Sequence, residues 1–397
     1  DRLLIVTFTN AAAAEMRSRI EARLYLECQN NPDDVFLMKQ KQLIQSADIC
    51  TIDSFCINLV RENFEKCGVS PDFKIGNRAR LDELSDKAMS ETVSELFKNN
   101  TADFKKLLEL TGCENDEANL VSAIQKIYTY SRQLPFPERF IASLEKPYTM
   151  PFDRNHPWYK SAFSQAEEYI ENIRNHIAEL TEESAKMSID SESYLQYSEK
   201  AALLTDALFK GLENSSWNEF KEILSTASFP SLPRAKEKSD PYVNAAKETK
   251  KKASDTLKSL SLLFRQTEEE IANDISELKG AVMLFCATVN SFADRLFNEF
   301  NNDGNFDFYN TEQLALSLLC ECDDEGNISI RDDANELVCR YDEVLVDEFQ
   351  DVNDLQNLLF YALSNKEKKL FAVGDLKQSI YGFRGSNPKN FLLKKQT

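Results

Sequence analysis

The spacing of apolar positions divides the chain into three zones. In the first zone, residues 1–64, the run Leu3–Phe8 is compact and rich in β-branched residues, which predicts a buried parallel strand. Apolar residues in 11–26 recur at helical spacing, and residues 48–52 form a second short apolar run before another helical pattern. The first zone is therefore predicted to be α/β.

The second zone, residues 65–305, carries a 3.6-residue apolar period almost throughout, with charged residues on the opposite faces. This pattern predicts a helical block. The expected helical stretches are Leu81–Phe97, Asn119–Arg132, Ala162–Leu180, Ser193–Leu212 and Ala245–Phe300. Within this block, Ser225–Tyr242 contains three Pro residues among charges and is expected to be a loose linker.

The third zone, residues 306–397, returns to an α/β pattern. Strands are predicted at 342–346 and 369–373, with a helix at 355–363 between them. Two α/β pieces that flank a long helical block indicate one sheet domain split by an insertion, because insertions are tolerated where the chain ends of a loop lie close together. We therefore expect an α/β domain built from 1–64 and 306–397, with an all-α inserted domain at 65–305.

The formal net charge of −19 opposes contacts to nucleic-acid phosphates, which need Lys and Arg. It does not exclude a DNA motor, because such proteins hold single strands through local grooves and aromatic stacking. The nine Cys form no disulfide framework, and with only two His a zinc site is not expected. Free thiols fit a reducing cytosol. No signal peptide and no apolar run of membrane-spanning length is found, so no membrane partner is expected.

The strongest local signal for chemistry is Tyr341–Asp351, an apolar strand that stops at Asp347-Glu348. Ligands bind at the carboxyl edge of open parallel sheets, and Mg²⁺ needs one or two fixed carboxylates beside nucleotide phosphates. Asp347 is therefore a candidate Mg²⁺ ligand, and Glu348 a candidate base that orients the attacking water. The alternative is a strand with a solvated acidic end.

A second strand runs into the loop Val373–Gly385, which holds an amide, two aromatic rings and a guanidinium. Gln378 can contact a phosphate oxygen without bringing a charge. Tyr381 and Phe383 can stack on bases, which contributes about 1–3 kcal/mol per base, and Arg384 can pair with a backbone phosphate. The alternative is an aromatic pair in a core beside a turn.

Two further strand ends carry polar residues at helix N-termini, which are intrinsic anion sites. Phe8 and Asn10 follow the first strand, and Thr51 and Ser54 follow the second. Taken alone, each of these signals is weak and is explained better by helix N-capping.

In this order, the four segments resemble motifs Ia, Ib, II and III of UvrD/RecB-like helicases. They read Thr-Phe-Thr-Asn-x-Ala-Ala-x-Glu-Met, Thr-Ile-Asp-Ser-Phe, Asp-Glu-Phe-Gln-Asp and Gly-Asp-x-Lys-Gln-Ser-Ile-Tyr-x-Phe-Arg-Gly. The Asp-Ser form of the second motif and the opening DRLLIVTFTNAAAAEMRSRI are most similar to the AddA type of helicase–nuclease. Ile124–Phe140 resembles the inserted helical domain of that family.

The resemblance implies an incomplete RecA-like (P-loop NTPase) parallel sheet domain that uses ATP and Mg²⁺. Asp347 and Glu348 would bind the metal, with Glu348 as the catalytic base. The nucleotide state would be sensed by Gln350, Asp351 and Gln378. The residues implied to line the single-strand track are Phe8, Asn10, Thr51, Ser54, Tyr381, Phe383 and Arg384. Phe383 stands where many relatives carry Trp, and Asn310 replaces the second acid of an Asp-Phe-x-Asp-Leu segment.

The function implied is that of the helicase core of a double-strand-break-processing helicase–nuclease. It would act on single- and double-stranded DNA with an AddB-like partner subunit in the bacterial cytoplasm. The Gly-rich phosphate loop does not occur in the chain and is expected just before Asp1, and the second RecA-like domain after Thr397. We therefore predict that the chain alone does not hydrolyse ATP. The alternatives are a stand-alone UvrD-like helicase without a nuclease, or a non-catalytic DNA-binding or scaffold module.

Overall fold

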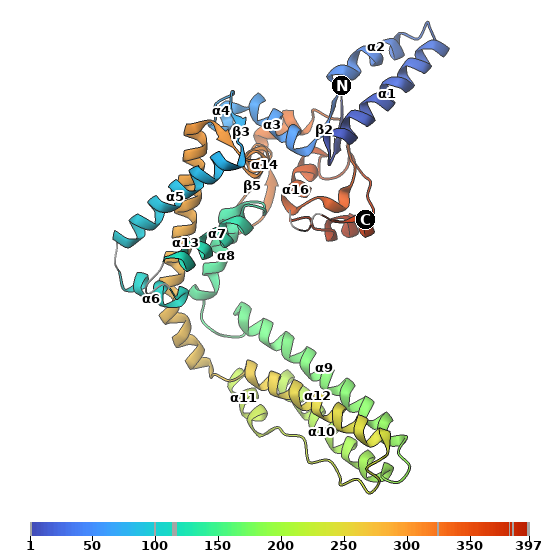
Figure 1. Ribbon diagram of the computed structural model, residues 1–397, viewed down its shortest axis with the longest axis vertical. Helices are drawn as coiled ribbons and strands as arrows, with labels where there is room; N and C mark the ends of the chain where they lie inside the picture. Colours follow the sequence, from blue (N-terminus) through green and yellow to red (C-terminus); the bar gives the residue numbers. More distant parts are fainter. Residues whose placement is uncertain are drawn as a thin grey trace. The chain divides into compact units, whose positions relative to one another are not determined.

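The structure is a computed structural model that describes residues 2–98, 101–112, 117–323, 325–380, 382 and 385–394 (Figure 1). The chain forms two compact units, which are treated separately below. The first comprises Asp1–Leu144 with Met283–Thr397, and the second comprises Glu145–Val282. The predicted boundaries of the inserted domain, at 64/65 and 305/306, thus differ from the divisions between these units and stay a prediction.

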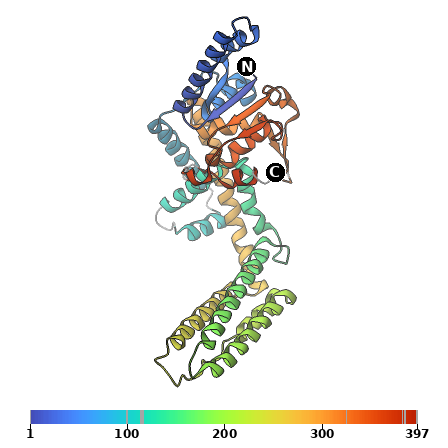
Figure 2. The same ribbon diagram turned by 90° about the vertical axis from the view of Figure 1, so that its right-hand side faces the viewer.

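The first unit contains a four-stranded parallel sheet in the order β2-β1-β7-β8. Its strands are β1 (Leu3–Thr7), β2 (Asp48–Thr51), β7 (Glu343–Val346) and β8 (Leu370–Ala372). The register pairs Leu4 with Val344 in the centre of the sheet. Figure 2 shows the blue and orange strands of this sheet beside one another. The expectation that both ends of the chain build one α/β sheet is therefore confirmed.

Alternating burial explains why these short segments form strands at the centre of a layered fold. Leu4 and Val6 of β1 are buried, as are Val344 and Val346 of β7. Helix α3 (Ile52–Glu62) packs on β1 and β2, and α14 (Phe308–Ser317) packs between α3 and α16 (Asp354–Leu363). The first turns of these three helices lie at the carboxyl edge of the sheet, which is where a parallel sheet binds ligands.

The remaining helices of the first unit extend this layer. They are α1 (Asn10–Asn30), α2 (Val35–Leu43), α4 (Phe64–Cys67), α5 (Arg78–Lys98), α6 (Ala102–Thr111), α7 (Ala118–Ser131), α15 (Asn335–Val338) and α17 (Lys389–Lys394). Two helices have residues in both units: α8 (Pro137–Thr149) and α13 (Glu268–Asp303). Two small sheets complete the unit, a parallel pair β3 (Lys74–Ile75) with β4 (Asn305–Phe306) and an antiparallel pair β5 (Cys320–Cys322) with β6 (Ile328–Ile330).

Helices α1 and α2 form a hairpin (Figure 1), and α1 packs against β1 and β2. The Arg17 guanidinium donates to the carbonyl oxygens of Ile44, Ala47 and Ile49 at 2.6, 3.0 and 3.1 Å. These carbonyls lie just before and within β2. The bonds therefore hold the α1 helix, which follows the first strand, against the second strand.

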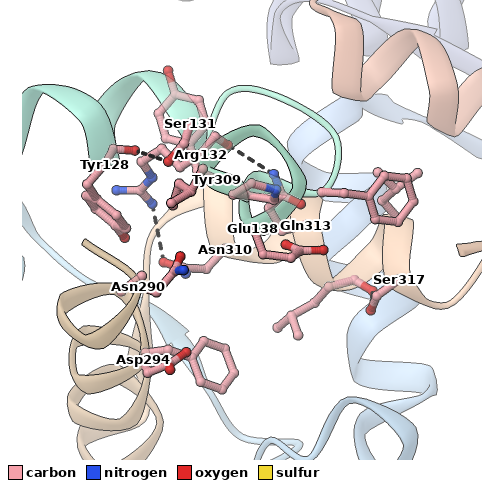
Figure 3. Close-up of a pocket in the computed structure, with 17 residues that line it drawn as sticks. Tyr128, Ser131, Arg132, Glu138, Asn290, Asp294, Tyr309, Asn310, Gln313 and Ser317 are labelled. Carbon is pink, nitrogen blue, oxygen red and sulfur yellow. Dashed lines mark hydrogen bonds between the residues drawn. The ribbon is translucent and has the colours of Figure 1, made fainter. Parts of the chain in front are cut away.

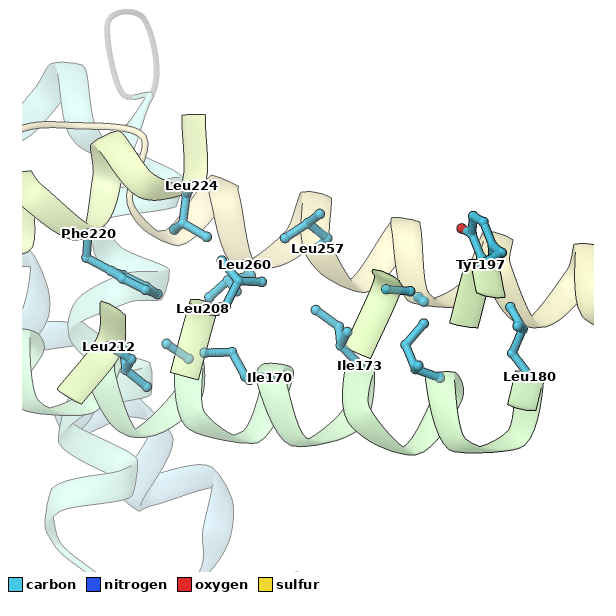
Figure 4. Packing of buried hydrophobic residues seen from close by; sticks show 14 of the residues in the cluster. Ile170, Ile173, Leu180, Tyr197, Leu208, Leu212, Phe220, Leu224, Leu257 and Leu260 are labelled. Atoms are coloured by element: carbon cyan, nitrogen blue, oxygen red, sulfur yellow. The ribbon is translucent and has the colours of Figure 1, made fainter. Parts of the chain in front are cut away.

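The second unit is helical, as predicted. It contains α9 (Pro157–Ala185), α10 (Ser191–Asn214), α11 (Trp217–Thr226), α12 (Pro241–Leu263) and the start of α13. Figure 4 shows Ile170 of α9 beside Leu208 and Leu260 of its neighbours, and Leu180 of α9 at the other end of the cluster, near Tyr197. In the described stretch 227–240, between α11 and α12, no helix forms, which agrees with the predicted linker.

The prediction of one helical stretch over Ala245–Phe300 is wrong, because the helix is interrupted after Leu263. Phe264 is buried against Trp217, with ring centroids 4.5 Å apart, and the Trp217 indole donates to the Gln266 carbonyl at 2.9 Å. Thr267 and Glu270 then bond each other's backbone N–H, which starts α13 afresh.

Among the described residues, no helix has both the length and the apolar character needed to cross a membrane.

Candidate nucleotide and DNA site

The acid pair lies where β7 leaves the sheet. The Asp347 N–H donates to the carbonyl of Val6 at 2.9 Å, so the backbone is still held by β1 at this point. The Asp347 carboxylate accepts from the Glu348 N–H at 3.0 Å. Glu348 adopts φ +54°, in the left-handed region that costs a residue with a side chain about 1–2 kcal/mol. The chain thus turns sharply directly after the metal-ligand candidate, and the Glu348 side chain is exposed.

Gln350 connects the acid pair to the loop that follows β8. Its side chain is only 1% exposed, its Nε2 donates to Glu348 Oε2 at 2.7 Å, and its Oε1 accepts from the Asp375 N–H at 2.9 Å. The backbone of Gly374 passes so close that a Cβ there would lie 2.4 Å from Gln350 Oε1. The buried Gln350 amide therefore links the Glu348 carboxylate to the backbone of the loop after β8.

Asp351 makes a second connection between the same two segments. Its Oδ1 accepts from the Ser379 hydroxyl and from the Ile380 N–H, both at 3.3 Å. Gln378 is exposed and donates to the Asp375 carboxylate at 3.0 Å. The predicted nucleotide-sensing residues thus belong to one hydrogen-bonded edge of one sheet. Tyr381, Phe383 and Arg384 lie outside the described residues.

The predicted DNA-contacting residues near β1 and β2 occupy the same edge. Phe8 is half-buried, and Asn10 is exposed as the first residue of α1. Thr51 is buried as the N-cap of α3, where its hydroxyl accepts from the Ser54 N–H at 3.3 Å and donates to the Ser54 hydroxyl at 2.9 Å. The Thr51 hydroxyl therefore positions the helix start, and Ser54 is the more accessible of the two. A direct DNA contact by these residues stays a prediction.

The Asp-Phe-x-Asp-Leu-like segment anchors α14 through a partly buried ion pair. Asp307 caps α14 by accepting from the Asn310 N–H at 3.0 Å, and it pairs with Arg132 at 2.5 Å. The Arg132 guanidinium lies over the rings of Tyr128 and Tyr309, 5.1 and 4.8 Å from their centroids. Figure 3 shows this arrangement and the contact from Arg132 to Asn310, which measures 3.4 Å. The uncharged Asn310 can therefore still contact Arg132 at this position, because its amide oxygen accepts from the guanidinium.

Tyr128, Arg132 and Tyr309 also line a cavity of about 580 Å³ between α7, α8, α13 and α14. Figure 3 shows these three side chains at the cavity. Gln313 of α14 supports the neighbouring loop by donating to the carbonyls of Arg132 and Leu134 at 3.1 and 2.7 Å. The same loop reaches the end of the β8 loop, since a Cβ on Gly385 would lie 2.6 Å from Gln133 Oε1. The helical segment and the β8 loop are therefore in contact within the first unit.

Glu312 is a candidate site residue that the sequence reasoning did not identify. It is only 3% exposed and lines a second cavity, of about 250 Å³, at the carboxyl edge of the sheet. Burial raises the pKa of Glu312 well above its ordinary value of 4.5, the hydrogen bond from Gln356 opposes this shift, and the charge of Asp53 adds to it. The available signal was an acid on the buried face of α14, in line with Ala315 and Leu316.

The residues present fit a nucleotide-bound Mg²⁺. The described residues contain no group of three or more His, Cys, Asp or Glu side chains that could hold a metal ion. Mg²⁺ bound beside phosphates needs only one or two carboxylates, with waters and phosphate oxygens completing its shell. Asp347 and Glu348 at the strand end supply that number.

The parallel sheet, the acids at its carboxyl edge and the amide bridge to the next strand define the class of this protein as a RecA-like α/β domain with helical additions. The chain belongs to the family described as UvrD/REP helicase N-terminal domain, which it matches over residues 1–397.

Three bacterial relatives, each named as one of the subunits of an ATP-dependent helicase/nuclease, are similar to the chain over almost its whole length. The protein from Clostridioides difficile is 30% identical over 409 residues, which is 99% of this chain and 32% of the relative. The protein from Acetivibrio thermocellus is 30% identical over 411 residues, covering 100% and 32%. The protein from Lachnoclostridium phytofermentans is 30% identical over 412 residues, covering 99% and 29%. The chain therefore spans about a third of the length of these relatives.

Proposed function

We propose that this chain is the first motor domain of an ATP-dependent DNA helicase–nuclease, which unwinds DNA during the processing of double-strand breaks. The observation that carries the proposal is the Gln350 amide, which joins Glu348 to the N–H of Asp375 in the next strand's loop. A motor needs such a link, because hydrolysis at one strand end must move residues that hold DNA at the next.

Within the site, Asp347 would hold Mg²⁺, and the metal would supply positive charge beside the ATP phosphates. Glu348 orients the attacking water and accepts its proton. Gln378 contacts the γ-phosphate, and Gln350 and Asp351 transmit its loss to the β8 loop. The DNA partners are a single strand along the strand ends and the duplex ahead of it. The names of the relatives favour a helicase–nuclease with an AddB-like partner over a stand-alone helicase.

The edge of the sheet supports a site completed by further sequence. β8 is the outer strand of the described sheet, and its Phe371 side chain is 58% exposed. Strands of parallel sheets are ordinarily buried. We propose that one more parallel strand pairs with β8 and carries the phosphate-binding loop that this sequence lacks.

Substitutions in the complete protein that contains this chain test the proposed function. We expect Glu348→Gln to lower the single-strand-stimulated ATPase rate at least about a hundredfold while ATP binding is retained, because the base is lost and the phosphate contacts are not. The matched control is Glu343→Gln, an exposed carboxylate at the opposite end of the same strand. Its rate should equal the wild-type rate. Wild-type protein without DNA-stimulated hydrolysis would instead indicate the non-catalytic module.

A further inference from the structure

Glu312 connects the two helices that follow the strand ends of the site. It lies on α14, which packs between α3 and α16, and its side chain is buried. Its Oε1 accepts from Gln356 Nε2 at 2.7 Å. Gln356 cannot turn away, because its Oε1 and its backbone N–H are both bonded to Asn353 in the cap of α16. The α16 cap therefore fixes one oxygen of the Glu312 carboxyl.

The Glu312 carboxyl also contacts a second acid. Its Oε2 atom is buried and receives no hydrogen bond from an N–H group or a hydroxyl of the described residues. The Glu312 side chain nevertheless hydrogen-bonds the side chain of Asp53, in the first turn of α3. Two ionised carboxylates only accept and repel each other, so a hydrogen bond between them requires that one of them keeps a proton. The helices α14 and α3 are therefore joined through one proton.

The surroundings place this proton on Glu312 rather than on Asp53. Asp53 is half-exposed and lies in the first turn of α3, where the positive end of the helix dipole stabilises a negative charge. Glu312 lines the cavity of about 250 Å³, and no Lys, Arg or His is among the described residues that line it. Burial raises the pKa of Glu312 against the opposing bond from Gln356, and the charge and hydrogen bond of Asp53 raise it further. Glu312 is thus the donor and Asp53 the acceptor.

The other charged and titratable groups around Glu312 do not offset a negative charge on it. They line the cavity or lie on the helix and strand that pack on α14, and they are Asp307 (paired with Arg132), Asp351, Tyr309, Cys56 of α3 and Cys320 of β5. Burial raises the pKa of both thiols, so they stay neutral. Asp354, in the first turn of α16, is bonded to Asn387 instead. An ionised Glu312 would therefore lie among acids and neutral groups, close to the Asp53 charge.

The carboxyl pair lies between the two parts of the proposed motor site. On one side, the α16 cap begins at Asn353, shortly after the segment Phe349–Asp351 that follows the acid pair. On the other side, Asp53 stands between Thr51, the N-cap of α3, and Ser54. The shared proton therefore connects the segment after the acid pair to the strand end that carries predicted DNA contacts.

Resting on the function proposed above, we propose that Glu312 is a positioning residue of the motor: it keeps its proton, donates a hydrogen bond to Asp53, and so holds the first turn of α3 against the α16 cap in the position that contacts DNA. Loss of this proton leaves two like charges side by side, which pushes the turn away from the cap. The hold on the single strand therefore weakens as pH rises, while the acid pair that hydrolyses ATP is unchanged.

The test is the single-strand-stimulated ATPase of the complete protein that contains this chain, measured with oligothymidylate at several pH values. Between pH 7 and pH 9, the half-saturating DNA concentration of wild type should rise about tenfold more than that of Glu312→Gln, because a contact that needs one proton weakens up to about tenfold per pH unit above the pKa of its group. The Gln amide donates to Asp53 at every pH, and its oxygen still accepts from Gln356. The kcat of this variant at saturating DNA should stay near that of wild type.

Two further variants and one spectrum check that the proton is responsible. Asp53→Asn should also remove the excess rise, because its amide can donate to an ionised Glu312. The exposed Glu336→Gln on α15 is the matched control and should keep the wild-type pH profile. Infrared difference spectra of wild type minus Glu312→Gln at neutral pH should show the carbonyl band of a protonated carboxyl.

The outcomes separate the positioning role from the proposed function. Equal pH profiles of wild type and both amide variants, or the absence of the carboxyl band, overturn the positioning role and leave the motor function intact. A lower kcat with unchanged half-saturation in Glu312→Gln also overturns it, since the residue would then act on hydrolysis. Thermal unfolding shows whether Glu312→Gln is folded, and if it is not, Asp53→Asn at its half-exposed position gives the same comparison. Wild-type protein without DNA-stimulated hydrolysis overturns the proposed function and the positioning role together.

Discussion

Gly374→Ala probes the contact between the loops that follow β7 and β8 more directly than any change to a charged residue. The added Cβ would lie 2.4 Å from Gln350 Oε1 and 3.2 Å from the backbone nitrogens of Phe349 and Gln350. The Gln350 side chain cannot move aside, because it is buried and bonded to Glu348 and to the Asp375 N–H. Overpacking costs about 1–3 kcal/mol, and a buried amide that loses its partner costs about 1–3 kcal/mol more. We therefore expect the first unit to lose about 2–5 kcal/mol of stability.

The assay can separate the two units, because both tryptophans, Trp158 and Trp217, belong to the second one. Amide hydrogen exchange of β7 and β8 should accelerate in Gly374→Ala, while the urea midpoint of tryptophan fluorescence stays unchanged. Gly382→Ala is the matched control, since a Cβ there meets nothing within 4 Å. Exchange in β7 and β8 that is equally slow in Gly374→Ala and Gly382→Ala would refute the reasoning that this glycine is required by close packing.

Two further changes test the buried charges. Because the pKa of Glu312 is raised in the folded state, the folded state binds more protons than the unfolded state above pH 4.5. The contribution of Glu312 to stability is therefore complete below pH 4.5 and is lost as pH rises, so Glu312→Gln should gain stability over wild type progressively from pH 5 to pH 9 in urea unfolding. A difference in stability that does not depend on pH would contradict this. Arg132→Met should lower the free energy of unfolding by about 3–5 kcal/mol, or somewhat less because the ion pair is partly exposed, since the Asp307 carboxylate loses its cation. The double variant Arg132→Met with Asp307→Asn should recover part of this loss in the same measurement. No recovery would show that the arginine acts by packing alone.

The elements of the sheet were predictable because their signals are local. Leu3–Phe8 and the run before Asp347 combine β-branched residues with a polar stop, and both became strands at the expected places. That both ends of the chain share one domain followed from the two α/β zones that flank the helical block, but the pairing of Leu4 with Val344 was not predicted, since no local pattern specifies a partner 340 residues away. The interruption after Leu263 was missed because the apolar period continues through it, although Thr267 and Glu270 carry the capping signal.

The site was predictable to the extent that its residues follow strands. Asp347, Gln350 and Gln378 stand directly after predicted strands, and the sheet brings their loops to one edge. Glu312 was not predictable in the same way, because its role depends on which way α14 turns its faces. The bond that fixes Gln356 against Glu312 comes from a helix cap, and a sequence does not reveal which neighbour such a cap will meet.

The split sheet also bears on how the protein is made. The central strand β1 leaves the ribosome some 340 residues before its partner β7, a separation that the Arg2–Asp342 ion pair also spans. Contacts of such long range form slowly, and unpaired apolar strands in a nascent chain invite aggregation. The helices of Glu145–Val282 form a compact unit from one continuous segment and can fold during synthesis. Production of this protein should therefore depend on chaperones that shield Leu3–Thr7 until translation has passed Val346.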